Sequence, residues 1–467
     1  MHKNLHFHFI GIGGIGMSAL AIILKQRGFT VSGSDCNLEQ KSIYQLQELG
    51  CTIYDADNTL ECLSITPDVV CYTAAVRPNN LELVAARKRN IPLITRAQLL
   101  AELFNKQEGI AIAGAHGKTT TSSLIAHIVC QAGYDPTYAI GGHLHNYQTN
   151  ARAGSGQYFI AETCENDHAI ELVRPTLAVL TNVDREHLDV YNDLEAIKKA
   201  FLKYLNNIPF YGKAVICNDD PHAASLIERL DPTLQKRIIT YGFTPQSDIF
   251  VQDYQLFADH TIATVRTAQK IIGQFTLAIP GKHNLLNSLA ALAVSQEIGI
   301  PFATFAAACE NFLGIDRRFT LKGLYKGATL YDDYGHHPSE IEQIVPVAYK
   351  KAQEQGGRLI ILFQPHRFSR TEKLWTEFVQ VLSKAPFDEL IITDIYGAFE
   401  DPIEQVTSER LVAELQCVSR SKQVCYVPED KQFKNVHKVL DGSVQKNDLV
   451  LFLGAGKINA LADILVQ

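Results

Sequence analysis

Short apolar runs alternate with longer segments of mixed polar and apolar positions along almost the whole chain. Apolar runs of about four to six residues are typical of strands buried on both faces of a parallel sheet, and the longer segments are typical of helices. Strands that alternate with helices indicate βαβ units. The pattern therefore predicts the α/β fold class, with mostly parallel sheets.

The first predicted unit opens with the strand Leu5–Ile10, a glycine-rich turn and a helix that ends near Arg27. A second strand, Thr30–Ser32, ends near Asp35, and a weaker alternation continues to about Phe104. A strand, a helix and a second strand in this order predict a βαβ unit.

The second predicted unit starts with the apolar strand Ile110–Ala113, which leads into a loop and a helix that ends near Gln131. Its later strands are Tyr158–Ala161, Leu177–Thr181 and Ala214–Cys217, and the helix Leu285–Ile298 closes it. A third unit begins near Gly314, with the strands Thr329–Tyr331, Leu359–Phe363, Leu390–Thr393, Gln423–Tyr426 and Leu449–Leu453. We therefore expect three domains, 1–105, 106–313 and 314–467.

Length and composition agree with three globular domains. At about 150 residues per domain, the 467 residues correspond to three. The net charge of -7 does not call for a nucleic-acid partner. The ten cysteines are scattered and form no C-x-x-C pair. They indicate reduced thiols rather than a disulfide framework or zinc site, and so predict a cytoplasmic protein.

One apolar segment, Phe9–Leu24, resembles a signal peptide because it is uncharged and follows Lys3. Glycines interrupt it, however, and it continues into the βαβ pattern. It is also shorter than the roughly 20 apolar residues that span a bilayer. We interpret it as part of a folded domain, and we expect no membrane insertion.

The turn within that segment fits the pattern G-x-G-x-x-G at Gly11, Gly13, Gly14 and Gly16, and Asp35 follows the strand after it. Small residues let the backbone approach a pyrophosphate, and the helix N-terminus supplies N–H donors. By itself the turn favours a nicotinamide or flavin enzyme, and a tight turn without a ligand stays an alternative. Asp35 does not discriminate, because uridine and NAD both offer a ribose.

A second phosphate loop consists of Gly114, Ala115, His116, Gly117, Lys118, Thr119 and Thr120. It departs from the strict Walker pattern, which would have glycine where Ile112 stands. Its backbone N–H groups are expected to hold phosphate oxygens, with Lys118 on the β- and γ-phosphates and the Thr119 hydroxyl on Mg²⁺. Two phosphate-binding turns in one chain predict two nucleotide-bearing ligands, one of them ATP.

Polar residues follow two strands of the second unit. Glu162, Glu165 and Asp167 come after Tyr158–Ala161, where a carboxylate can complete a Mg²⁺ shell beside Thr119. The segment from Thr181 to Asp189 contains His187, which is either a ligand of a second metal, a phosphate-orienting group or an ordinary exposed histidine.

The third unit carries Asp332–Pro338 and Gln364–Thr371, each after a strand. In the second of these segments, Arg367 and Arg370 are candidates for a carboxylate clamp, because a guanidinium pairs bidentately with a carboxylate. Solvated arginines remain the alternative at this point.

Together these motifs resemble the Mur ligase family, essentially from end to end and in the family's order. The resemblance also rests on Pro280–Asn287 and Gly314–Phe319. It implies a Rossmann-like N-terminal domain for a UDP-sugar, a central P-loop-type ATPase domain and a Rossmann-like C-terminal domain that brings the amino acid.

The resemblance implies an ATP- and Mg²⁺-dependent ligase that joins L-alanine to the carboxylate of UDP-N-acetylmuramate through an acyl phosphate, in peptidoglycan synthesis. It places His283, Asn284 and Asn287 near the ATP base and ribose, and Glu165 and His187 at the metal. Lys118, His187, His336, Arg367 and Arg370 are the residues expected to act in catalysis. The glycine turn and Asp35 are expected to bind the UDP-sugar.

Some positions depart from the family pattern. Cys164 and Asn166 flank Glu165 where Asp and Ser are usual, and Lys457 and Asn459 stand where Asp and Gly are usual. Three alternatives stay open: a recycling ligase that adds a preformed tripeptide to the same sugar nucleotide, an NAD-dependent oxidoreductase and a non-catalytic nucleotide-binding protein. The oxidoreductase leaves Lys118 and Thr119 without a role.

Overall fold

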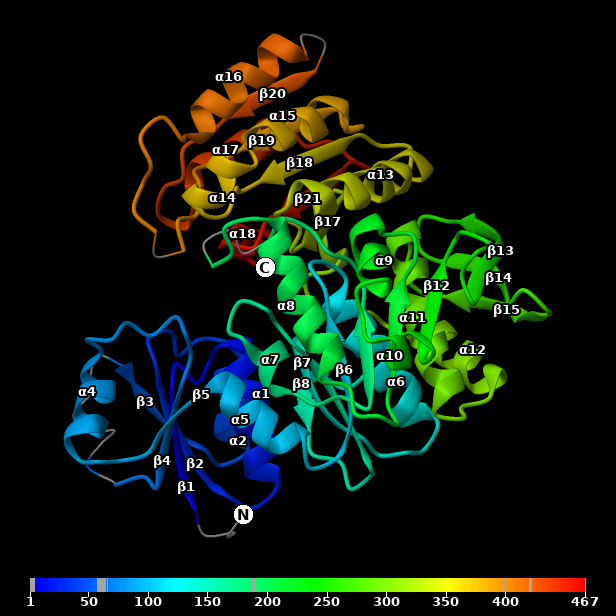
Figure 1. Ribbon diagram of the computed structural model, residues 1–467. Helices are drawn as coiled ribbons and strands as arrows, with labels where there is room; N and C mark the ends of the chain where they lie inside the picture. The colour runs from blue at the N-terminus through cyan, green and yellow to red at the C-terminus, as the bar shows by residue number, and fades with distance from the viewer. Residues whose placement is uncertain are drawn as a thin grey trace. The chain divides into compact units, whose positions relative to one another are not determined.

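The structure is a computed structural model that describes residues 5–56, 64, 66–186, 190–398, 400–419 and 422–466. It divides into two compact units (Figure 1). The first comprises Met1–Tyr254, Ile262–Leu277 and Leu286–Leu313, and the second comprises Gln255–Thr261, Ala278–Leu285 and Gly314–Gln467. The first unit contains the N-terminal sheet, and the second contains the C-terminal sheet. The three domain boundaries expected from the sequence stay a prediction.

The N-terminal sheet has the order β3-β2-β1-β4-β5, with every neighbouring pair parallel. Its strands are β1 (His6–Ile10), β2 (Thr30–Asp35), β3 (Thr52–Asp55), β4 (Val69–Tyr72) and β5 (Leu93–Thr95). Its helices are α1 (Ile15–Gln26), α2 (Lys41–Glu48), α4 (Leu81–Lys88) and α5 (Arg96–Phe104). The strand order reverses beside β1, and ligands of such sheets bind at the carboxyl ends of the strands near that point. The glycine turn follows β1 there.

Successive side chains of β1 point to opposite faces of this sheet. Phe7 and Phe9 are buried in the same apolar core as α1. His8 points to the other face, where its Nδ1 lies 2.8 Å from the Ser32 hydroxyl and its Nε2 lies 2.9 Å from a Glu82 carboxylate oxygen. Both His8 and Glu82 are buried, and each polar group satisfies the other.

The central sheet has ten strands in the order β15-β14-β13-β12-β11-β10-β6-β9-β7-β8. The strands are β6 (Glu108–Ala113), β7 (Thr137–Leu144), β8 (Thr149–Arg152), β9 (Tyr158–Glu162), β10 (Leu177–Leu180), β11 (Lys213–Cys217), β12 (Ile238–Gly242), β13 (Ile249–Leu256), β14 (Thr261–Arg266) and β15 (Ile271–Leu277). β6 is parallel to β9 and β10, whereas β7 and β8 form an antiparallel hairpin. The sequence predicted β6, β9, β10 and β11 but not the β7–β8 hairpin or β12 to β15.

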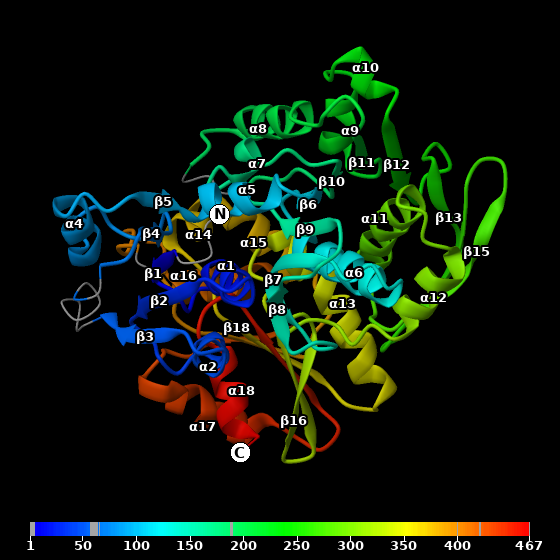
Figure 2. The same ribbon diagram turned by 90° about the horizontal axis from the view of Figure 1, so that it is seen from below.

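The helices that accompany this sheet are α6 (Lys118–Gln131), α7 (Ala169–Leu172), α8 (Leu194–Asn206), α9 (Pro221–Ile227), α10 (Pro232–Gln235), α11 (Lys282–Glu297) and α12 (Phe302–Glu310). The expectation that 285–298 closes this part of the chain was wrong, because α12 follows it after Pro301. Figure 2 shows α1 beside the β7–β8 hairpin, and the two are in contact. The N-terminal and central sheets therefore share a packed seam.

The C-terminal sheet has the order β16-β17-β21-β18-β19-β20, in which only the β16–β17 pair is antiparallel. Its strands are β16 (Thr320–Tyr325), β17 (Ala328–Asp333), β18 (Leu359–Phe363), β19 (Glu389–Ile392), β20 (Gln423–Tyr426) and β21 (Leu449–Leu453). Its helices are α13 (Pro338–Glu354), α14 (Phe368–Lys373), α15 (Trp375–Lys384), α16 (Ser408–Val418), η2 (Lys431–Phe433), α17 (Lys434–Ser443) and α18 (Asn459–Leu465).

The central strands of this sheet are apolar throughout because both faces are covered. Leu359, Ile361 and Phe363 of β18 lie in one apolar core, and Ile360 and Leu362 lie in the other. Continuous apolar runs are expected of parallel strands buried on two faces. All five strands predicted for this region are confirmed, and β16 is an addition. Three sheets, each mostly parallel, confirm the predicted α/β fold class.

Within the described part of the chain, no helix combines the length and the apolar character that crossing a bilayer requires. The segment that resembles a signal peptide forms the end of β1, the glycine turn and most of α1.

Candidate active site

The loop between β6 and α6 strongly favours glycine at two positions. Gly114 has a φ of +135° and Gly117 a φ of +79°, and both are backbone conformations that side chains disfavour. A Cβ on Gly114 would lie 2.1 Å from the Thr181 hydroxyl oxygen, and one on Gly117 would lie 2.5 Å from Asn287 Oδ1. The loop thus turns directly into the N-terminus of α6, whose first N–H groups have no partner within the helix.

The segment after β10 holds this loop in place. The backbone N–H of His116 donates to Asn182 Oδ1 at 2.8 Å, and the Thr181 hydroxyl donates to the His116 carbonyl at 2.7 Å. The His116 ring also lies 3.0 Å from an Asp184 oxygen. The beginning of the predicted Thr181–Asp189 segment is therefore a scaffold for the loop. His187, predicted for the metal or phosphate, lies outside the described residues.

Lys118 folds back over the loop. Its Nζ donates to the carbonyls of Gly114, at 2.5 Å, and Ala115, at 2.8 Å. Burial lowers the pKa of Lys118, but the nearby carboxylates, Glu165 foremost, outweigh burial and raise the pKa above its usual value. The side chain is therefore a fixed cation at the loop, as its predicted role on the phosphates requires.

Carboxylates from the end of β9 face the first turn of α6. Thr119 donates its hydroxyl hydrogen to Glu162 Oε2 at 2.9 Å, and the same oxygen accepts the Gly141 N–H at 3.0 Å. Glu165 is only 1% exposed. Hydroxyl and carboxylate oxygens are the ligands that Mg²⁺ prefers, so this group fits the predicted cation. The structure singles out Glu162 as the partner of Thr119, which the sequence alone did not.

Residues expected at the ATP base and ribose fall in two parts of α11. Asn287 is 8% exposed and lies against Gly117 of the loop. His283 and Asn284 belong to the second unit. Burial, assisted by the Arg318 charge, lowers the pKa of His283 to about 4, so the ring is neutral at pH 7. A role for His283 and Asn284 beside ATP stays a prediction.

The N-terminal glycine turn is closed by Asp35. Gly11 has a φ of +77°, and the Gly13 N–H donates to Asp35 Oδ2 at 2.8 Å. Asp35 is 7% exposed, and a Cβ on Gly13 would lie 2.9 Å from its Oδ2. One of the donors expected for a pyrophosphate therefore bonds Asp35 in this structure. At Gly14, by contrast, a Cβ would meet nothing closer than 3.5 Å.

In the C-terminal unit, three predicted residues follow strands of one sheet. The His336 ring donates from Nδ1 to the Tyr334 carbonyl at 2.9 Å, and it lies 5.4 Å from the His366 ring, centre to centre. Arg370 donates to His366 Nδ1 at 3.0 Å. His336 and Arg370 thus share a cluster through His366, which the sequence did not single out. Arg367 has its guanidinium 3.7 Å from Glu400 instead.

Two further arginines approach this cluster through Tyr334. The guanidinium of Arg317 lies 4.8 Å from the centre of the Tyr334 ring, and that of Arg318 lies 5.5 Å from it. Arg317 also donates to the Gly454 carbonyl at 2.6 Å and lies 3.5 Å from the buried Asp332. Neither arginine was predicted, because their meeting with Tyr334 depends on the fold of the β16–β17 region.

Comparison with known protein families covers nearly the whole chain. Residues 6–108 match the Mur ligase family catalytic domain, residues 112–295 the Mur ligase middle domain and residues 317–456 the Mur ligase glutamate ligase domain. The chain belongs to the Mur ligase family.

Two full-length relatives of this Mur ligase carry the same name. A UDP-N-acetylmuramate–L-alanine ligase of Syntrophus aciditrophicus is 41% identical over 465 residues, which cover 100% of this chain and 94% of the relative. An enzyme of the same name from a Geobacter species is 43% identical, covering 98% of this chain and 96% of the relative. The crystal structure of the UDP-N-acetylmuramate–alanine ligase of Thermotoga maritima superposes with a TM-score of 0.82 at 28% identity, covering 99% of this chain and 98% of the other.

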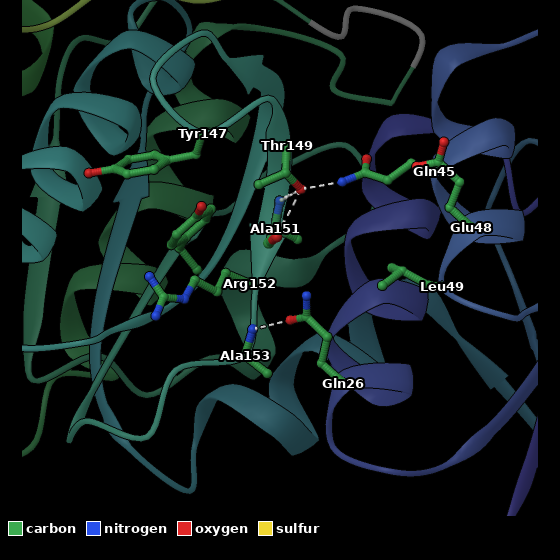
Figure 3. A pocket seen from close by; sticks show the side chains of 10 residues that line it. Gln26, Gln45, Glu48, Leu49, Tyr147, Thr149, Ala151, Arg152 and Ala153 are labelled. Carbon is green, nitrogen blue, oxygen red and sulfur yellow. Dashed lines mark hydrogen bonds between the residues drawn. The ribbon is translucent and has the colours of Figure 1, made fainter.

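A cavity of about 630 Å³ lies on the seam of the first unit of this Mur ligase (Figure 3). Gln26 at the end of α1 and Gln45 of α2 line one side, and Thr149 and Ala153 line the other. Two hydrogen bonds cross it: Gln45 donates to the Thr149 hydroxyl at 2.8 Å, and the Ala153 N–H donates to Gln26 at 2.7 Å. No predicted site residue lines it, and it lies at the opposite end of α1 from the glycine turn.

Proposed function

We propose that this chain is an ATP-dependent ligase that forms an amide bond between the carboxylate of UDP-N-acetylmuramate and L-alanine, in peptidoglycan synthesis. One observation carries the proposal: full-length relatives at 41 and 43% identity bear this name. The loop that holds Lys118 beside carboxylates supports it. The reaction consumes ATP and releases ADP and phosphate.

The first step activates the substrate carboxylate. A carboxylate oxygen attacks the γ-phosphorus of ATP, the bond to the β-phosphate oxygen breaks, and an acyl phosphate and ADP result. Lys118 places a permanent positive charge at the loop, where negative charge spreads over the transferring phosphoryl oxygens. The α6 N-terminus supplies N–H donors to the same phosphates.

Thr119, Glu162 and Glu165 form an oxygen donor set for Mg²⁺, supported by the 2.9 Å contact between Thr119 and Glu162. When bound, Mg²⁺ neutralises phosphate charge during the transfer. Glu162 keeps Thr119 oriented, and the buried Glu165 holds a negative charge near Lys118.

The second step forms the amide. The alanine amine attacks the acyl carbon, and phosphate leaves. We propose that Arg370 binds the alanine carboxylate and that His336 lies next to it, with the His366 ring ordering both. The glycine turn, including Gly14, is proposed to seat the UDP pyrophosphate. Because the described cysteines are all free thiols, we place the reaction in the cytoplasm, where thiols stay reduced.

Phosphate release from ATP tests the whole proposal. With UDP-N-acetylmuramate present, L-alanine should stimulate phosphate release more than any other amino acid, and the product should gain the mass of one alanine residue. Faster release with the preformed tripeptide than with L-alanine would instead identify a recycling ligase. Tight binding of NADH with no response to the UDP-sugar would contradict both.

A further inference from the structure

Arg96 lies at the carboxyl edge of the N-terminal sheet, next to the glycine turn. It is the first residue of α5 and follows β5 directly. A Cβ on Gly16, in the first turn of α1, would lie 3.0 Å from Arg96 Nη1 and 3.1 Å from its Cδ. The guanidinium therefore packs on Gly16, and any side chain at this position would push it away.

The same guanidinium contacts the acidic segment after β9. Arg96 donates from Nε to Asp167 Oδ2 at 2.7 Å, and its Nη2 donates to the same oxygen. The Arg96 side chain is 19% exposed and that of Asp167 is 15% exposed. Asp167 lies two positions beyond Glu165, a proposed metal ligand. One cation thus joins the proposed UDP-sugar turn to the proposed ATP site.

A purely structural clamp is the simplest alternative, but the seam of the first unit is already held elsewhere. Asn150 of β8 is fully buried and donates to the Ile15 carbonyl of α1 at 2.7 Å. Arg27 donates to Gln107 at 2.7 Å, and Figure 3 shows the two hydrogen bonds that cross the cavity. Because a largely buried ion pair recovers little more than its desolvation penalty, Arg96–Asp167 adds little stability to this seam.

We propose that Arg96 is a substrate-binding residue that exchanges Asp167 for an oxyanion of the UDP-sugar. The inference rests on the proposed function. A guanidinium fork accepts carboxylate and phosphate oxygens alike, and UDP-N-acetylmuramate offers both a pyrophosphate and a lactyl carboxylate. Exchange of one anion for another keeps the largely buried cation paired throughout, which avoids the penalty of an unpaired charge.

The exchange also explains the contacts on each side of Arg96. Because Gly16 has no side chain, the guanidinium lies beside the α1 N-terminus. An anion there is attracted both by the guanidinium charge and by the positive end of the helix dipole. Asp167 forms an ion pair with that guanidinium in place of the substrate anion. When the substrate displaces it, the freed carboxylate stays in the acidic segment that carries Glu165.

The two partners of the ion pair then have opposite effects on binding. Arg96→Ala should weaken UDP-N-acetylmuramate binding by about 10- to 100-fold, the range of a lost charge-assisted pair. Asp167→Asn removes the competing anion, so the substrate should bind at least as tightly as to the unaltered protein. A structural clamp would instead weaken binding equally in both variants, because both break the same bond.

Calorimetric titration of the full-length protein with UDP, UDP-N-acetylglucosamine and UDP-N-acetylmuramate, without ATP or Mg²⁺, measures these effects. If Arg96→Ala binds all three compounds more weakly, Arg96 binds the pyrophosphate. If only UDP-N-acetylmuramate binds more weakly, Arg96 binds the lactyl carboxylate. Arg27→Ala, which removes a seam arginine, is the matched control and should bind all three normally. Arg96→Lys keeps the charge but not the fork, and should lose part of the affinity even if Arg96→Ala does not fold.

Two results would overturn the inference. The first is that Arg96→Ala binds all three compounds with affinities within twofold of those of the unaltered protein. If the alanine variant does not fold, the same result with Arg96→Lys would count. The other is Asp167→Asn losing as much affinity as Arg96→Ala. If the unaltered protein binds none of the three compounds, the proposed function fails and this inference falls with it, so the two failures are distinguishable.

Discussion

At the scale of single residues, charges set by their surroundings carry the chemistry. Lys118 bonds two loop carbonyls, and the carboxylates near it keep it protonated. In the C-terminal unit, Asp332 is almost fully buried, and its pKa is raised to about 7, chiefly by burial and against the pull of Arg317. We propose that Lys118 binds phosphates, and we expect Asp332 to make stability depend on pH.

Lys118→Ala should cut turnover by at least 100-fold, because fixed charges aimed at a transition state typically contribute that much. Circular dichroism should show the fold retained, since the hydrogen bonds lost are those to two loop carbonyls. Lys118→Arg is the control that retains charge with a different shape. Turnover near normal in folded Lys118→Ala would remove this residue from the mechanism.

Asp332 should make the protein less stable as pH rises. Its pKa of about 7 in the folded chain exceeds its ordinary value of 3.8, so between these values the native state holds a proton that the unfolded state has lost. The free energy of unfolding therefore falls with rising pH, by at most about 1.4 kcal/mol per pH unit for one proton. Urea unfolding from pH 4 to 8 should show a shallower decline for Asp332→Asn. Identical slopes for both proteins would contradict the prediction.

At the scale of elements, the same arrangement recurs: a strand ends, a tight turn follows, and a helix begins whose first N–H groups have no partner within the helix. At α6 the turn requires glycine for two separate reasons, backbone conformation and space. At position 133, at the other end of the same helix, glycine is favoured by backbone conformation alone. Gly133 has a φ of +82°, and a Cβ there would meet nothing within 4 Å.

Gly117→Ala and Gly133→Ala form a matched pair that separates these reasons. Each should lower the free energy of unfolding by about 1 to 2 kcal/mol, the penalty of a left-handed alanine. Only Gly117→Ala should also weaken ATP binding, because its methyl group displaces Asn287 beside the loop. Chemical denaturation and ATP titration measure both quantities. Equal ATP affinity in the two variants would show that the loop tolerates the displacement.

The turn between β18 and α14 supports a prediction about alanine. Arg370 bonds His366 in the cluster with His336, whereas Arg367 lies near Glu400. Arg370→Ala should therefore raise the KM for L-alanine at least tenfold and change the KM for ATP little. Arg367→Ala serves as the comparison and should have the smaller effect on alanine. Equal, small changes in both KM values for Arg370→Ala would mean that this arginine is structural.

At the scale of the whole molecule, the chain forms two compact units with separate apolar cores. The proposed UDP-sugar turn lies in the first unit. UDP-N-acetylmuramate at about 100 times its Kd should stabilise that unit by about 2.7 kcal/mol. Hydrogen exchange should slow in β1 and α1 and stay unchanged in β18 and β21. Equal protection in both units would contradict binding confined to the first.

The sequence by itself determined the strongly apolar strands and the positions of the two glycine turns, because both are local. An apolar run such as Leu359–Phe363 has one stable environment, a strand covered on two faces, and the glycines of a turn mark backbone conformations that other residues avoid. The α/β class, the family and the loop around Lys118 followed from such patterns. Strands of mixed polarity, such as β16 and the β7–β8 hairpin, lack that signal and were missed.

Only the tertiary structure decided which side chains meet across long stretches of sequence. Thr119 and Glu162 are 43 positions apart, and Arg96 and Asp167 are 71 apart. Nothing in the sequence around Arg96 suggests a partner, because the contact exists only once α5 of the N-terminal sheet and the segment after β9 of the central sheet are packed together. Thr119 and Glu162 meet because β6 and β9 are neighbouring parallel strands whose carboxyl ends share one edge. Arg96 and Asp167 follow strands of two different sheets and meet only because those sheets pack together.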